Sequence, residues 1–491
     1  MSTTTPAPTR RRAGGASEPR PARPGLALAT ILTAQLMMVL DTSIITTALP
    51  QVQHTFALST TGLAWVQSGY ALAFGGLLLL GARAGDLFGR RSIFLWGVAV
   101  FTLASLATGL AITTPWLLAA RVVQGLAAAA AIPSTLALIL ASYPKPAERA
   151  RAIALYSAVI GAGGALGNIV GGLFTEYLSW RWGLLINVPI GIAVLLVAPR
   201  VLAATTRQAG KFDLGGALTS TLGMTALVFG LTELETAPVF AWGSLAASLV
   251  LLAAFVFIER RAASPIVPLK LFKSVERSGA YAGRILIVGA MFSLFYFLSQ
   301  YLQGVLHFSP LLTGASFIPL TGLFFAMVYV VPSLTRLIGR STLLLASLAV
   351  ALGGMFWLSR LDAGSHFFPD VFGPLLVLGV GQGIAIILLT NFGMSDVPGE
   401  IAGAASGLVN AAHQLGGTIG LAILTIVFSV ALGPSGRFTA HAFGVVFGVS
   451  TEFYALAVLL AVGMLIAHGI RTRTARRAAD AAAGDPLQLA A

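Results

Sequence analysis

Two charged residues interrupt long apolar runs, and both could take part in proton chemistry. Asp41 lies in the apolar run 25–50, and Arg121 lies in the run that begins near Trp116. A charged side chain inside a membrane is costly, so its presence there indicates a function by default. Burial disfavours the ionised form of a carboxylate, which lets such a group exchange a proton near neutral pH. We therefore predict that Asp41 takes part in proton coupling.

Arg121 is the predicted partner of Asp41. A helix rises about 1.5 Å per residue, which puts Arg121 about 8 Å below the start of its run and Asp41 about 12 Å below Leu49. The two side chains are then at similar depth and could face one cavity. Arginine keeps its proton, but its charge influences when a neighbouring carboxylate loses one. The alternatives are a structural carboxylate that pins its helix and an arginine that anchors its helix at the membrane interface.

His413 is a rival proton site. It lies beside Asn410 and Gln414, and histidine is the side chain most easily titrated near neutral pH. A hydrogen-bonded packing histidine is the alternative. Arg284 lies close to the end of its apolar run, and we expect it to be an interfacial anchor.

A substrate cavity is predicted from aromatic, thioether and amide side chains. The run around residue 295 is rich in aromatic residues, which can hold lipophilic cations or face lipid. The methionines near Asp41 would form a pliable wall. The predicted lining residues are Met37, Met38, Tyr70, Gln124, Tyr156, Phe292, Phe295, Tyr296 and Gln300.

The elements that must position these residues are membrane-spanning helices. The chain of 491 residues is 57% hydrophobic and only 10% charged, whereas a soluble domain carries about 25% charged residues. Its apolar segments are continuous rather than alternating, which argues against a β-barrel, and lipid offers the backbone no partner outside a helix. Fourteen segments are predicted, near 26–49, 61–82, 92–112, 116–141, 151–174, 181–199, 213–233, 241–259, 279–303, 310–335, 341–359, 370–391, 402–430 and 444–468.

The predicted fold is an all-α polytopic membrane protein built from two pseudo-symmetric six-helix bundles and two extra helices. The loop Asp86-Leu-Phe-Gly-Arg-Arg91 has an echo in Arg336-Leu-Ile-Gly-Arg340, as expected of two repeated halves. The predicted parts are a tail at 1–24, bundles at 25–200 and 278–470, inserted helices with their loops at 201–277, and a tail at 471–491.

The orientation follows from the positions of the cations. With both termini in the cytoplasm, all but five of the 30 Lys and Arg residues lie in cytoplasmic segments, as the positive-inside rule requires. The net charge of +13 then favours anionic lipid headgroups as partners over nucleic acid. The chain has no Cys, which excludes disulfides and thiolate metal sites.

Four motifs resemble those of the major facilitator superfamily and, within it, the fourteen-helix drug:proton antiporter branch. They are Leu40–Pro50, with Asp41; Gly81–Arg91, with Asp86, Gly89 and Arg90; Arg121–Gly125; and the glycine-rich Gly163–Gly172. The stretch from Ser179 to Asn187-Val188-Pro189 is also similar to this branch. Asn168 and His413 depart from the family pattern, which has Pro and Arg at these places.

The resemblance implies alternating access in the cell membrane, with proton entry driving small amphipathic molecules, cations included, out of the cell. It implies no cofactor beyond the proton gradient, no metal and a monomer whose partners are substrate, protons and lipids. Asp86 would latch onto the helix that begins near Ile401. The predicted conformational-switch residues are Asp86, Gly89, Arg90, Gly163, Gly167, Asn168 and Gly171.

Other functions stay open at this point. An importer of the same fold and an exporter of one endogenous metabolite fit the same sequence. A membrane enzyme is disfavoured because the loops are short and carry no catalytic motif. A channel is disfavoured because no ring of charge or filter motif is present.

Overall fold

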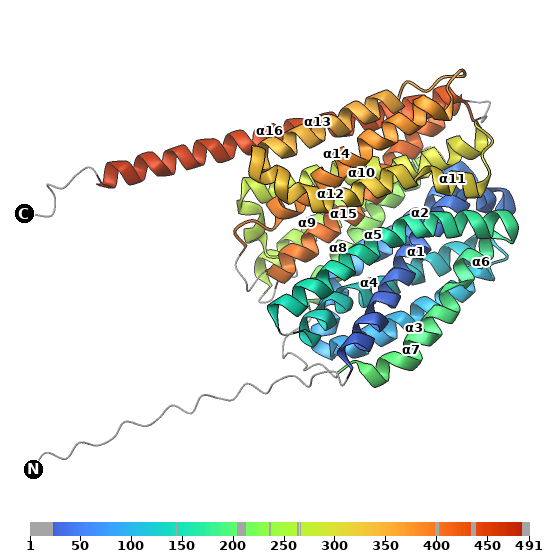
Figure 1. Ribbon diagram of the computed structural model, residues 1–491, viewed down its shortest axis with the longest axis horizontal. Helices are drawn as coiled ribbons and strands as arrows, with labels where there is room; N and C mark the ends of the chain where they lie inside the picture. Colours follow the sequence, from blue (N-terminus) through green and yellow to red (C-terminus); the bar gives the residue numbers. More distant parts are fainter. Residues whose placement is uncertain are drawn as a thin grey trace, which may run out of the picture.

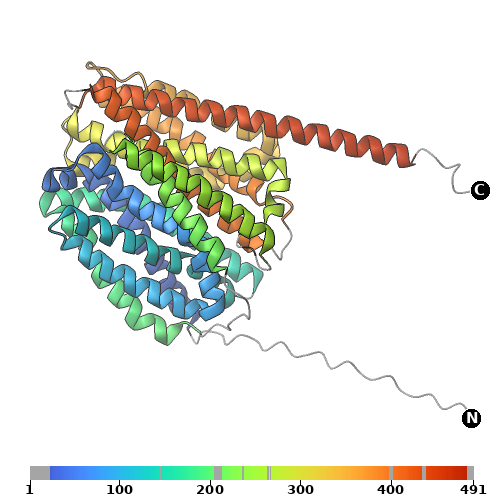
Figure 2. The same ribbon diagram turned by 180° about the vertical axis from the view of Figure 1, so that it is seen from behind.

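The computed structural model describes residues 23–483, except 144, 204–212, 235–236, 263–264, 266, 398–401 and 434–437. All regular secondary structure in this part of the chain is helical. The helices run roughly alongside one another, and α1 begins on the same side of the molecule on which α16 ends (Figures 1 and 2). We call this side, where α1 begins at Pro24, the terminus side, and the opposite side the far side.

The first half of the chain forms one group of helices, in which α1 packs on α5 and α4 packs on both α2 and α3. Short α6 and α7 together take the place of one predicted segment. The helices of this group are α1 (Pro24–Phe56), α2 (Thr60–Phe88), α3 (Arg90–Gly109), α4 (Thr114–Ser142), α5 (Pro146–Tyr177), α6 (Trp180–Leu185) and α7 (Asn187–Val201).

The second half forms a similar group, in which α10 packs on α15 and α16, and α14 packs on α12 and α13. Along the chain, the two halves are separated by α8 (Leu214–Thr232) and α9 (Pro238–Arg261), which pack on each other. The remaining elements are η1 (Leu269–Lys273), α10 (Val275–Gly304), α11 (Pro310–Ser316), α12 (Ile318–Ile338), α13 (Arg340–Leu358), η2 (Phe367–Val371), α14 (Phe372–Gly393), α15 (Ala402–Leu432) and α16 (Ala440–Ala483).

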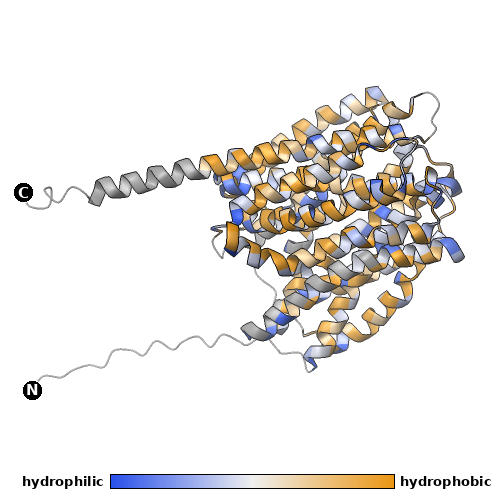
Figure 3. Ribbon diagram, turned by 45° about the horizontal axis from the view of Figure 1, so that its top comes forward, coloured by the Kyte–Doolittle hydropathy of each residue, from blue (hydrophilic) through white to orange (hydrophobic). Residues whose placement is uncertain are grey.

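Each of the fourteen predicted segments coincides with a helix or a consecutive pair of helices. Among the described residues, eleven helices are long and apolar enough to cross a membrane, and Gly215–Leu231 is a shorter apolar helix. The helices consist largely of hydrophobic residues, and hydrophilic residues gather towards their ends (Figure 3). The chain is therefore a polytopic membrane protein, while the count of fourteen spans stays a prediction.

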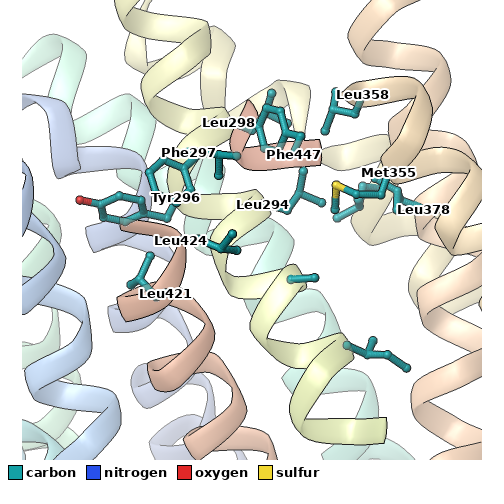
Figure 4. Packing of buried hydrophobic residues seen from close by; sticks show 14 of the residues in the cluster. Leu294, Tyr296, Phe297, Leu298, Met355, Leu358, Leu378, Leu421, Leu424 and Phe447 are labelled. Atoms are coloured by element: carbon teal, nitrogen blue, oxygen red, sulfur yellow. The ribbon is translucent and has the colours of Figure 1, made fainter. Parts of the chain in front are cut away.

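The apolar core has two main clusters. One joins the halves on the far side, where Leu49 and Trp180 of the first half share a cluster with Tyr301 and Phe443 of the second. Figure 4 shows part of it, in which α10 presents an apolar face to the leucines of α15. The other cluster contains only first-half residues and includes Met37.

Candidate functional site

Asp41 and Arg121 form a buried ion pair in the first half. Arg121 Nη1 lies 2.5 Å from Asp41 Oδ2, and the two side chains are 1% and 0% exposed. The predicted contact between helices α1 and α4 is confirmed. Arg121 also donates from Nε to the Val66 carbonyl oxygen at 3.1 Å, and its guanidinium lies over the Tyr70 ring, 4.7 Å from its centre.

Amide groups hold the other carboxylate oxygen. Gln124 Nε2 donates to Asp41 Oδ1 at 2.8 Å, and Asn187 Nδ2 donates to the same atom at 2.9 Å. Ser105 Oγ accepts from Gln124 Nε2 at 2.8 Å. The carboxylate thus accepts from three side chains, one of them a cation, and hydrogen bonds between charged groups are among the strongest in proteins.

Asn187 and Ser105 were not predicted to belong to this network. Asn187 begins α7, at the break between the two short helices that together replace one straight span. The sequence marked Asn187 only as part of a motif. The direction in which a side chain at such a break points follows from the packing of the neighbouring helices.

A cavity of about 200 Å³ lies between the two halves. The first half contributes residues of α1, α2 and α5, and the second half contributes residues of α10, α12 and α14. The lining residues are Thr42, Ser43, Thr46, Gln67, Gly164, Asn168, Met291, Phe292, Phe295, Leu320, Thr321, Phe324, Phe325 and Gln382.

Asp41 does not line this cavity, although Thr42 and Ser43 do. The carboxylate points from α1 into the interior of the first half, where it meets α4 and α7. The expectation that Asp41 and Arg121 face the cavity therefore does not hold in this conformation. The cavity and the ion pair lie on different faces of the same turn of α1.

The predicted cavity residues are divided between the cavity and the core. Phe292 and Phe295 line the cavity. Met37, Met38 and Tyr70 lie in the first-half apolar cluster, Tyr296 lies in the far-side cluster, and Gln124 belongs to the ion-pair network. Tyr156 donates to Gln35 Oε1 at 3.3 Å, and Gln300, 1% exposed, donates to the Tyr296 carbonyl oxygen at 3.4 Å.

The glycine-rich helix α5 presents two stripes of small residues to two different neighbours. A Cβ on Gly171 would lie 2.8 Å from Ile44 Cα, and one on Gly163 would meet Leu36 and Val39, so one stripe packs on α1. Gly167 belongs to the same stripe and approaches the Leu40 backbone. Close backbone approach of this kind requires small residues.

The second stripe of α5 faces the other half. Gly164 and Asn168 line the cavity, and a Cβ on Gly172 would lie 2.5 Å from the Pro310 carbonyl oxygen of α11. Asn168 Oδ1 accepts from Thr47 Oγ1 of α1 at 3.4 Å, a hydrogen bond between two helices. Helix α5 thus connects α1 to the second half.

Hydrogen bonds across the halves cluster on the far side. Ser299 Oγ donates to the Thr46 carbonyl oxygen at 3.2 Å, and Gln303 Nε2 donates to the Thr47 carbonyl oxygen at 3.1 Å. Together with the apolar cluster that the halves share there, these bonds close the far side.

The two related loops have the same backbone geometry. Gly89 joins α2 to α3 with φ 94°, and Gly339 joins α12 to α13 with φ 79°. Glycine alone adopts such angles without strain. The similarity between the two loop sequences therefore reflects the same tight turn in each half. Arg90 begins α3. The side chain of Asp86 and the residues around Ile401 lie outside the described residues.

His413 lies next to Arg284 rather than next to a carboxylate. Arg284 Nη2 lies 3.4 Å from His413 Nδ1. The centres of the His413 and Phe292 rings are 5.7 Å apart, and the rings are arranged edge to face. Since a guanidinium only donates, Nδ1 is the acceptor and carries no proton in this contact. Arg284 is 7% exposed and lies about 15 Å along α10 from the first residue of that helix. The expectation that it is an interfacial anchor is therefore wrong.

Comparison with known proteins gives one consistent family. A profile of the Major Facilitator Superfamily matches residues 31–421. The chain is 37% identical over 448 residues to the cephamycin export protein of Amycolatopsis lactamdurans, covering 89% of this chain and 92% of that protein. It is 38% identical over 464 residues to the puromycin resistance protein of Streptomyces alboniger, covering 89% of this chain and 88% of that protein.

Solved structures agree on the fold. A nucleoside transporter superposes with a TM-score of 0.67 at 12% identity, covering 89% of this chain and 99% of that one. A peptide transporter solved in complex with sulfate gives the same TM-score of 0.67 at 13% identity, covering 89% of this chain and 94% of that one.

Proposed function

Because the chain belongs to the major facilitator superfamily, we propose that it exports small amphipathic molecules across the cell membrane in exchange for protons. In this proposal it belongs to the fourteen-helix drug:proton antiporter branch, works by alternating access and has both termini in the cytoplasm. The names of the relatives, an export protein and a resistance protein, support the outward direction.

The observation that carries the proposal is a cavity with walls from both halves of the chain. A molecule bound there contacts α1 and α5 on one side and α10, α12 and α14 on the other. Tilting of the halves about such a central site exposes it to one side of the membrane and then to the other. With cytoplasmic termini, the closed far side is extracellular, and the conformation described here corresponds to a state closed to the outside.

The chemistry of the cavity suits amphipathic molecules. Four phenylalanines offer apolar surface, and Gln67, Asn168 and Gln382 offer amide groups. Drug-sized sites usually measure about 300–1,000 Å³, so the cavity of about 200 Å³ must widen when substrate binds. Widening requires movement of the helices that form its walls.

Proton coupling can reach the cavity through α1. Asp41 directly precedes the cavity residues Thr42 and Ser43. Protonation removes the charge that holds the carboxylate to Arg121 and the two amides, so α1 becomes free to shift against α4 and α7. The same movement displaces the cavity wall, which links proton uptake to substrate release.

The test of direction uses everted membrane vesicles with an acidic interior and a fluorescent amphipathic dye outside. A one-for-one exchanger should sustain about tenfold accumulation per pH unit, because a tenfold ratio corresponds to about 1.4 kcal/mol. A protonophore should release the dye, and vesicles without the protein are the control. Export of preloaded dye from such vesicles, driven by the acidic interior, would indicate an importer and contradict the proposal.

A further inference from the structure

A buried cation without a counter-ion lies on the cavity-facing side of α10. The Arg284 side chain is 7% exposed, and within the part of the chain that the structure describes no carboxylate forms an ion pair with it. Burying an isolated charge is strongly unfavourable, so buried charges are normally paired. Arg121 in the first half has such a partner, whereas Arg284 in the second half has none of opposite charge.

The neutral groups around Arg284 leave part of the guanidinium free. Nη1 donates to Thr390 Oγ1 at 2.7 Å and to the Ile386 carbonyl oxygen at 3.4 Å, and Nη2 contacts His413 Nδ1. Nε is buried and has no acceptor among the residues that the structure describes. A guanidinium can bind a carboxylate through two parallel N–H donors. In Arg284 the Nε–H, which can be one of these two donors, is not used by any described residue.

The position of Arg284 connects it to the cavity. Met291 and Phe295 line the cavity and lie seven and eleven residues after Arg284 on α10, a spacing that puts all three on one helix face. On α14, Gln382 lines the cavity, and Thr390 lies two turns further along the same face. A chain of contacts joins the guanidinium to the cavity: Arg284 contacts His413, the His413 ring contacts the Phe292 ring, and Phe292 lines the cavity.

The charges around the cavity favour an anion. None of the described residues that line it is charged. The carboxylate of Asp41 is fully buried and bound by three side chains, so it is not available to a substrate in this conformation. Arg284 is a buried charge with no ion-pair partner among the described residues, and electrostatic interactions are strong where water is excluded.

We propose that Arg284, with Thr390 and His413, is the anion-binding subsite of the cavity, and that the preferred substrates carry a carboxylate. This inference rests on the proposed export function and changes its substrate class, since the sequence suggested cations. A carboxylated amphipathic molecule places its aromatic part among Phe292 and Phe295, and its carboxylate reaches the Nε side of Arg284 once the Phe292 and His413 rings move aside.

The test compares three probes on one fluorescent scaffold: a carboxylic acid, its methyl ester and an amine analogue. Uptake is measured in acid-inside everted vesicles after subtraction of uptake by empty vesicles. Wild type should take up the acid about tenfold faster than the amine, equivalent to about 1.4 kcal/mol of discrimination. Arg284→Gln should lose most of the uptake of the acid and keep that of the ester, and Arg284→Lys should keep part of the preference.

A matched control removes a cation far from the cavity. Arg360→Gln alters an exposed arginine that packs over Phe356, and it should leave all three rates unchanged. If Arg284→Gln fails to accumulate in membranes, Thr390→Val keeps the charge and removes one of its hydrogen-bond partners. This variant should slow the acid selectively.

The outcomes separate the two proposals. If wild type transports the amine and the ester but not the acid, export stands and the anion subsite is wrong. If Arg284→Gln or Thr390→Val slows all three probes equally, Arg284 has a structural role and the anion subsite is again wrong. If wild type takes up none of the three probes into acid-inside everted vesicles above the level of empty vesicles, the export function itself is wrong.

Discussion

At the scale of residues, the Asp41–Arg121 pair sets the energy that coupling must supply. Breaking a buried ion pair by removing one partner costs about 3–5 kcal/mol. A proton that enters through a potential of about 100 mV gains about 2.3 kcal/mol, and each pH unit adds about 1.4 kcal/mol. The two quantities are of similar size, so one proton is sufficient to open this network.

The pair makes a specific prediction about stability. Asp41→Asn leaves the Arg121 guanidinium buried without a counter-ion, and we expect it to lower the free energy of unfolding by about 3–5 kcal/mol. The double variant Asp41→Asn with Arg121→Gln removes both charges and should recover part of this loss, while proton coupling stays absent. Thermal unfolding in detergent checks both, and a double variant less stable than the single one would contradict the account.

The sequence predicted this contact but not its whole network. Helix rise alone put Asp41 and Arg121 at similar depth, and each is the kind of residue that lipid forces to find a partner. Asn187 lacked such a signal because a polar side chain at a helix break can point in several directions. Ser105 lies inside α3, where a serine can instead bond to the backbone of its own helix. The sequence also did not distinguish Phe292 from Tyr296, which is one turn away on the same helix. Phe292 lines the cavity, whereas Tyr296 lies in the far-side cluster.

At the scale of elements, α5 acts as a connection between α1 and the second half. Its two stripes of small residues differ in what they touch: Gly171 meets the backbone of α1, whereas Gly164 has open space beside it. Both stripes were visible in the sequence as positions four residues apart, Gly163, Gly167 and Gly171 in one and Gly164, Asn168 and Gly172 in the other. Which stripe meets which neighbour depends on the rotation of the helix, and spacing does not determine that.

The two stripes should respond differently to a single methyl group. In Gly171→Ala the added Cβ would lie 2.8 Å from Ile44 Cα, so we expect destabilisation of about 1–3 kcal/mol from overpacking and slower transport. In Gly164→Ala the Cβ meets nothing within 4 Å, so stability should stay within about 0.5 kcal/mol of wild type. Thermal unfolding compares the two, and equal effects would contradict the packing described for α5.

At the scale of the whole molecule, the inserted helix α8 contacts both halves. Helix α8 packs on α2 and on α15, and its Thr221 Oγ1 donates to the Gly76 carbonyl oxygen at 3.0 Å. Figure 2 shows this part of the chain, in green, across the front of the molecule. We expect α8 to shift when the halves tilt, because it contacts both of them, a relation that hydropathy alone did not reveal.

Segment positions followed from the sequence because a bilayer demands about twenty apolar residues per span. The arrangement of those segments did not, since a residue such as Leu249, 73% exposed, and one such as Leu294, fully buried, are equally apolar. In a membrane the hydrophobic pattern does not distinguish lipid from core. The polar exceptions, Asp41 above all, therefore carried most of the information about the site.

The central claim is that Asp41 couples proton movement to substrate movement. Its most direct test is proton flux into dye-loaded proteoliposomes, driven only by a substrate gradient, alongside substrate exchange at equal pH on both sides. Wild type should do both. Asp41→Asn should still exchange substrate but move no protons. Proton flux at the wild-type rate in Asp41→Asn would contradict the account.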